Sequence, residues 1–63
     1  MPGQVFENDE HGNRTHYTCT TATGRTAEVW VEYNYENPKT IGAHIYRMEF
    51  DNGHVIVEPR RWN

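Results

Sequence analysis

Apolar and polar residues alternate with a period of two through most of the chain after residue 14. The clearest run covers residues 26–36, where odd positions are apolar or aromatic and even positions are mainly charged or amide. A period of two is typical of a β-strand with one buried face. We therefore predict a strand there, and further strands over residues 15–22, 40–50 and 54–58.

Turn signals separate these runs. Gly24, in the sequence TGR, can take a positive φ angle, and Pro38, in NPK, has no amide donor for a strand ladder. Pro59 ends the last strand for the same reason. The residues that follow it, Arg60 to Trp62, are therefore expected to leave the sheet.

The last hairpin sets the register of the predicted sheet. Asn52-Gly53 is the preferred dipeptide of a two-residue type I′ turn. This turn would place Phe50 opposite Val55, Met48 opposite Val57, and Arg47 opposite Glu58 for a cross-strand ion pair. A three-residue turn with a bulge at Gly53 would shift every pair by one position and mix the two faces. We therefore predict the two-residue turn.

Joined in chain order, the strands form an antiparallel meander, and the composition agrees with this. Leucine is absent, while threonine, tyrosine and β-branched residues, which favour strands, are frequent. The predicted main apolar face consists of Val29, Val31, Tyr33, Tyr46, Met48, Phe50, Val55 and Val57. The predicted second face is mixed and consists of Tyr17, Cys19, Glu28, Trp30, Glu32, Ile45, Arg47 and Glu49.

No amphipathic helix of ten residues is available to cover the main face. The all-β fold class therefore leaves three outcomes: a strongly twisted sheet, a half-open small barrel, or a sheet completed by homodimerisation. We expect one small domain over residues 15–63. Residues 1–14 are expected to form a flexible arm, with a short edge strand near Val5 as a fifth strand left open.

Charge and cysteine content limit the possible ligands and the cellular location. The 63 residues carry a net charge of −3 and have a pI of about 5.7, without the basic excess of a duplex-binding domain. Cys19 is the only cysteine, so no internal disulfide can form. The polar N-terminus lacks the apolar core of a signal peptide, and no apolar run approaches membrane-spanning length. These features predict a cytoplasmic protein.

Catalytic and metal-binding patterns are missing. The chain has no serine, and His16 lies three positions from Cys19, on the opposite side of a strand. Glu28 and Glu32 share a face but lie about 13 Å apart along the strand, too far for a catalytic carboxylate pair. The histidines match no zinc spacing, and we expect them at the surface. The sequence predicts no enzyme, no metal site and no cofactor.

Tryptophan, tyrosine and arginine, the residue types enriched at protein interfaces, crowd a chain too small to bury all of them. In size and composition, the chain resembles the small β proteins of phages and mobile elements that act as inhibitors or accessory subunits. We predict a module that binds and occludes a larger protein, with a homodimer left open. The expected contact residues are Tyr17, Glu28, Trp30, Glu32, Arg47, Arg60, Arg61 and Trp62.

Binding of single-stranded nucleic acid is the alternative function. Trp30, Tyr17 and Trp62 could stack on bases while arginines neutralise phosphates. Glu28 and Glu32 oppose this, because they lie beside Trp30 and would repel a phosphate backbone. The tail also leaves two alternatives open: Trp62 folds back onto the domain, or it projects and grips a partner.

Overall fold

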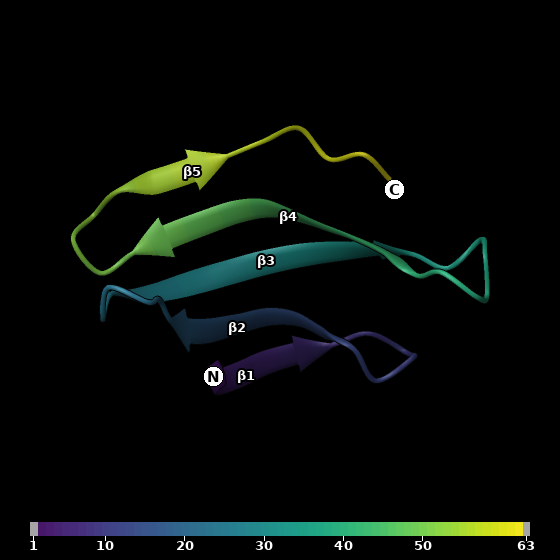
Figure 1. Cartoon of the computed structure of the whole chain (residues 1–63), viewed down its shortest axis with the longest axis horizontal. Helices are drawn as coiled ribbons and strands as arrows, with labels where there is room; N and C mark the ends of the chain where they lie inside the picture. Colours follow the sequence, from purple (N-terminus) through teal and green to yellow (C-terminus); the bar gives the residue numbers. More distant parts are fainter. Residues whose placement is uncertain (1, 63) are drawn as a thin grey trace.

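The computed structural model describes residues 2–62, and these form a single five-stranded antiparallel sheet (Figure 1). Its strands follow one another in chain order: β1 (Pro2–Asn8), β2 (Arg14–Thr20), β3 (Thr26–Asn34), β4 (Gly42–Phe50) and β5 (Val55–Val57). The predicted all-β meander is confirmed, with the fifth strand present. That strand is longer than expected: seven residues of the predicted arm form it, and it pairs with β2.

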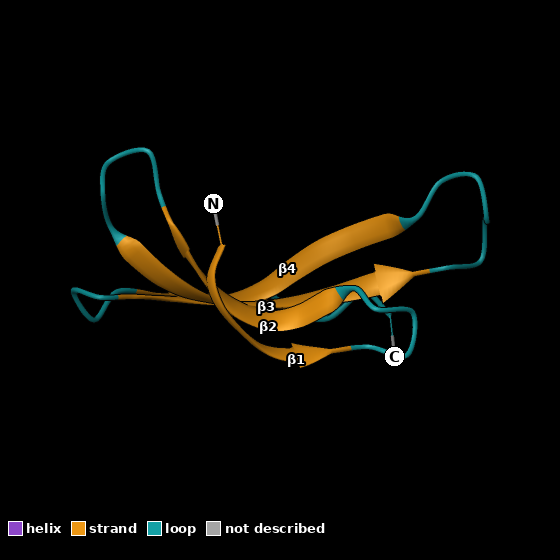
Figure 2. Cartoon of the chain, turned by 90° about the horizontal axis from the view of Figure 1, so that it is seen from below, coloured by secondary structure: helices purple, strands orange, loops and turns teal. Residues whose placement is uncertain are grey.

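The sheet is open and strongly twisted. Among residues 2–62, the edge strands β1 and β5 do not contact each other. Figure 2 shows how the twist turns the outer strands away from the plane of β3. Residues 2–62 also contain no helix that is long and apolar enough to cross a membrane. Within the single chain, the twisted open sheet is thus the form adopted.

Three of the four hairpins share one turn geometry. In the β4–β5 hairpin, the Phe50 amide donates to the His54 carbonyl at 2.8 Å, and the Gly53 amide donates to the Phe50 carbonyl at 3.0 Å. The same pair of bonds closes the turns that end at Gly12 and Gly24, and all three glycines have φ between 82° and 89°. This is a type I turn followed by a left-handed bulge residue. The repeated motif places a glycine three positions after the residue whose amide and carbonyl make the two closing bonds.

This geometry corrects the predicted register of the last hairpin. The turn has three residues instead of two, so Arg47 lies opposite Val57, Met48 opposite Ile56, and Glu49 opposite Val55. The Asn-Gly dipeptide suits both turns, and the three-residue form keeps Gly53 as the single left-handed residue. Val55 and Val57, which we expected in the core, consequently lie on the opposite face and are exposed.

Two further features of the strand register place residues on the face opposite to the predicted one. Tyr17 and Cys19 lie opposite Val29 and Ala27, so they belong to the main apolar face and not, as predicted, to the face of Trp30. In β4, an irregularity leaves one extra residue between Arg47, opposite Trp30, and Ile45, opposite Val31. Such a bulge reverses the side-chain parity beyond it. Ile45 therefore lies on the main face, while Tyr46 lies against Arg60.

The apolar core is small and centred on β3. Ala27, Val29 and Val31 are the apolar residues that are fully enclosed. Val5 of β1, Ile45 of β4 and Ile56 of β5 are each more than 40% exposed. One sheet therefore shields only its central strand and leaves apolar surface open on both faces.

The turn geometry predicts the effect of substituting Gly53. Gly53→Ala should lower the free energy of unfolding by about 1 kcal/mol, because an alanine at φ 89° is strained. Gly53→Asn should cost less, since asparagine tolerates the left-handed region. Urea unfolding followed by circular dichroism measures both variants. An alanine variant as stable as the native chain would contradict the turn assignment.

Candidate protein-binding face

Four side chains stack across four strands on the face that carries Trp30. The rings of Phe6 and His16 lie 4.7 Å apart, those of His16 and Trp30 lie 4.4 Å apart, and the Arg47 guanidinium lies 5.5 Å from the centre of the Trp30 ring. We call these four residues the aromatic row. It crosses β1 to β4, and Val57 of β5, opposite Arg47, continues it to the sheet edge.

Carboxylates flank the aromatic row and hold its polar members. Glu28 Oε2 lies 2.5 Å from His16 Nε2, and Glu7 Oε1 lies 3.9 Å from His16 Nδ1. Arg47 Nε donates to Glu49 at 2.7 Å. The side chains of Glu7 and Glu49 are 74% and 36% exposed. The row is therefore a pre-ordered surface with an acidic margin.

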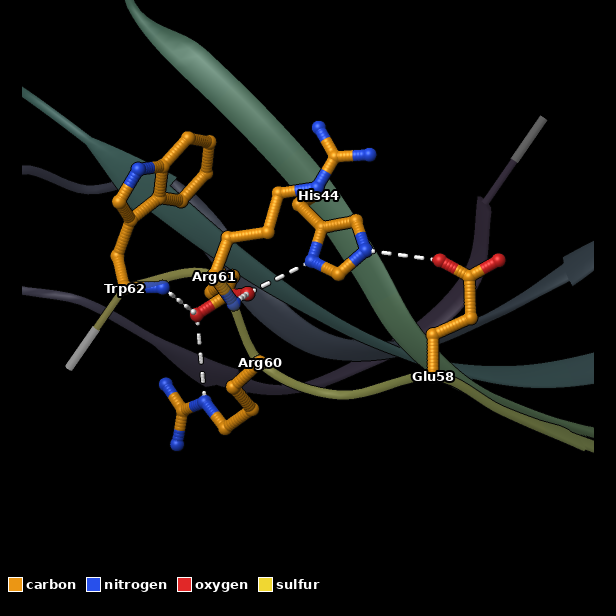
Figure 3. A network of polar contacts seen from close by, with 6 residues as sticks. His44, Glu58, Arg60, Arg61 and Trp62 are labelled. Carbon is orange, nitrogen blue, oxygen red and sulfur yellow. Dashed lines mark hydrogen bonds and ion pairs between the residues drawn. The ribbon is translucent and has the colours of Figure 1, made fainter.

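Beyond Trp30 on β3, the carboxylate of Glu32 is buried and accepts four hydrogen bonds. His44 Nδ1 and the Arg61 amide lie 2.7 Å from Oε2, while Arg60 Nε and the Trp62 amide lie 3.3 Å and 3.2 Å from Oε1. Figure 3 shows these donors converging on one carboxylate. Each oxygen thus has two donors, as a buried charge requires.

These bonds fold the C-terminal segment, Glu58 to Trp62, back onto the sheet. His44 also contacts Glu58, with Nε2 2.9 Å from Oε1, so it joins the start of this segment to Glu32 of β3. The Trp62 ring lies edge-on to His44 and against Gly42, where an added Cβ would stand 3.0 Å from the ring. Of the two alternatives for Trp62, the structure has the folded-back one, with the side chain half-buried.

These hydrogen bonds shift the pKa values of Glu32 and His44. Burial raises the pKa of Glu32, but the bonds from His44, the two amides and Arg60 outweigh it and lower that pKa to about 2. Hydrogen bonding to Glu32, and then to Glu58, raises the pKa of His44. Both groups therefore carry charge in the folded protein near pH 6.

The predicted contact residues divide between several environments. Glu28, Trp30, Glu32 and Arg47 lie on one face by register, as predicted. Within this set Glu32 is only 4% exposed, and Tyr17 lies on the other face of the sheet. In the C-terminal segment, Arg60 and Arg61 are exposed, and Arg60 also stacks on Tyr46.

Four residues of this face were not predicted: Phe6, His16, His44 and Glu58. The histidines were expected at the surface, but the His44 side chain is 7% exposed and that of His16 18%. The predicted Arg47–Glu58 ion pair is wrong, because Arg47 bonds Glu49 and Glu58 bonds His44. Of these four residues, only His16 could have been assigned to this face from the sequence. It occupies an even-numbered position of its strand, as its polar neighbours on that side of the strand do.

A second polar cluster orders the β1–β2 turn. Asp9 accepts hydrogen bonds from the amides of His11 and Asn13 and from the Tyr35 hydroxyl, and His11 stacks on Tyr35 with the ring centres 3.8 Å apart. A cleft of about 290 Å³ lies beside it, open to solvent. Across residues 2–62, no three metal-ligating side chains come close enough to hold an ion. Asp9, His11 and Tyr35 thus serve to hold the β1–β2 turn.

The Glu32–His44 pair predicts how stability depends on pH. Glu32 stabilises the fold above its ordinary pKa of 4.5, and this contribution is lost as the pH falls toward about 2. His44 stabilises the fold below its ordinary pKa of 6.5, and this contribution is lost as the pH rises through its raised folded-state pKa. Urea midpoints should therefore be highest between pH 4.5 and 6.5.

Glu32→Gln should flatten both limbs of this profile, while Glu36→Gln, at an exposed carboxylate, should leave it unchanged. A Glu32→Gln variant that kept the native pH profile would show that Glu32 does not govern it.

In comparisons with known proteins, no protein-family model, no curated protein and no solved structure matches this chain.

Proposed function

We propose that this protein is a non-catalytic module that binds a larger protein stoichiometrically and occludes part of its surface. The observation that carries the proposal is the aromatic row, a pre-ordered apolar and cationic stripe that lies open along one face. Trp and Arg are enriched among interface hot spots, and pre-ordering lowers the entropic cost of binding. No such stripe is needed for the core, which is centred on Val29 on the other face.

The charge around the row favours a basic partner surface. Glu7, Glu28 and Glu49 flank the row, and Arg47 is already paired with Glu49. The chain as a whole carries a net charge of −3. Complementary charge speeds encounter and disfavours wrong partners. Exposed Arg60 and Arg61 are proposed as additional contacts at one end of this surface.

Single-stranded nucleic acid is the second candidate ligand. Exposed rings on a β-sheet can stack on bases, which supports it. The three flanking carboxylates oppose it, because a phosphate backbone that followed the row would pass each of them. A protein partner is therefore the stronger proposal.

The cellular location and the biological role are proposed from size and composition. A 63-residue β protein with a single cysteine suits a reducing cytoplasm, where it would act as an inhibitor or accessory subunit of a phage or mobile element. The absence of catalysis is proposed on chemistry: the two closest carboxylate–histidine pairs of the described residues, Glu28–His16 and Glu32–His44, are engaged in hydrogen bonds that support the row and the tail.

Binding should depend on Trp30 and Arg47. With the native chain as bait in extract from the source organism, followed by titration of the purified partner, Trp30→Ala should weaken capture about thirtyfold. That is the effect of losing a hot spot of about 2 kcal/mol. Arg47→Ala should also weaken it, because the guanidinium that stacks on the Trp30 ring is lost.

Ile45→Thr is the matched control, because Ile45 is 42% exposed on the opposite face. Circular dichroism establishes that each variant is folded. Equal capture by the native chain and Trp30→Ala would contradict the proposal. Affinity for an oligothymidine at about 50 mM salt, lost in Trp30→Ala, would instead favour nucleic acid.

A further inference from the structure

The two edges of the sheet differ in how they are protected against pairing with another strand. The outer strand β1 begins at Pro2 and has register irregularities at three places along its pairing with β2. Bulges and proline are the usual devices that block strand addition. The other edge, β5, is regular, uncharged and apolar over Val55–Val57, and no segment lies beyond it in Figure 1.

The hydrogen bonds of β5 show which backbone groups remain open. The His54 carbonyl and the Glu58 amide point to β4, since they bond the Phe50 amide and the Tyr46 carbonyl. Alternate residues of a strand point their backbone groups in opposite directions. The amides and carbonyls of Val55 and Val57 therefore point outward, away from β4.

We propose that β5 pairs with β5 of a second copy of this chain, antiparallel and with a twofold axis through Ile56. This register places Val55 opposite Val57 of the second copy, and each such pair joins two residues whose backbone groups point outward. All four open groups of each strand are then bonded. The self-complementary sequence Val-Ile-Val makes the centred register the favoured one.

The flanking residues support the same register. Ile56 lies opposite its own copy on the main face, where it is 42% exposed in the single chain. His54 lies opposite Glu58 of the second copy, which places an imidazole near a carboxylate at both ends. A twofold antiparallel pairing is isologous, as in most homodimers. The product is one continuous ten-stranded sheet.

This pairing goes beyond the proposed protein-binding function and does not depend on it. In an antiparallel sheet, residues directly opposite each other project from the same face. The aromatic rows of both copies would therefore lie on the same side of the ten-stranded sheet. A partner with two equivalent sites would be held at both, which increases avidity without a new contact.

Engineered cysteines test the register directly. In a Cys19→Ala background, Ile56→Cys places two thiols opposite each other, in a non-hydrogen-bonded pair with Cα atoms about 4.5 Å apart. That spacing lies within the range of a disulfide. Val57→Cys is the matched control: residue 57 lies about 8 Å from its own copy, beyond disulfide reach.

On oxidation with oxidised glutathione, the Ile56→Cys chain should form covalent dimer at least about tenfold faster than the Val57→Cys chain, because only its thiols meet in the centred register. Equal rates would indicate random collision and overturn the proposal, as would a faster rate for Val57→Cys. Sedimentation of the native chain should also give a mass that rises above 7.4 kDa with concentration.

Val57→Pro removes one outward amide and leaves the β4–β5 bonds intact. The variant should therefore keep the fold and abolish the rise of mass with concentration. Persistence of the rise in a folded Val57→Pro chain would overturn the proposed edge.

Discussion

A single layer of strands must shield its own apolar side chains, and most features of this protein follow from that constraint. Residues 2–62 contain no helix and no second sheet. Only β3, with two strands on either side, encloses its apolar residues Ala27, Val29 and Val31. The outer strands keep large apolar side chains in water on both faces. A surface of this kind suits a protein that works by contact with another molecule.

The C-terminal segment partly makes up for the small apolar core by adding hydrogen bonds to the sheet. Glu32 lies in the central strand, where a charge is costly to bury, and the amides of Arg61 and Trp62 supply donors that make burial tolerable. His44 fills the remaining position on the same carboxylate and extends the network to Glu58. The tail therefore belongs to the folded domain. Its attachment leaves the aromatic row and the β5 edge uncovered, and these two surfaces carry the proposed interactions.

Much of this architecture could be predicted from local patterns, and the errors have identifiable causes. The alternation of apolar and polar residues correctly located β2 to β4 and placed Glu28, Trp30 and Arg47 on one face. The turn at Gly53 was wrong because Asn-Gly suits two hairpin geometries, and the bulge near Tyr46 carries no glycine or proline to mark it. Burial of Glu32 could not be predicted, since a carboxylate in a strand is typical of a solvated face. Its donors lie 12 to 30 positions away in sequence.

Amide hydrogen exchange, measured residue by residue by NMR, tests most directly the claim that Glu32 makes the tail part of the fold. The amides of Arg61 and Trp62 lie outside every strand, so local secondary structure would not protect them. If Glu32 binds them, their exchange should be slowed to a degree that approaches β3, and Glu32→Gln should abolish that protection while the sheet amides remain protected. Exchange of both amides at the rate of an unstructured chain in the native protein would contradict the account.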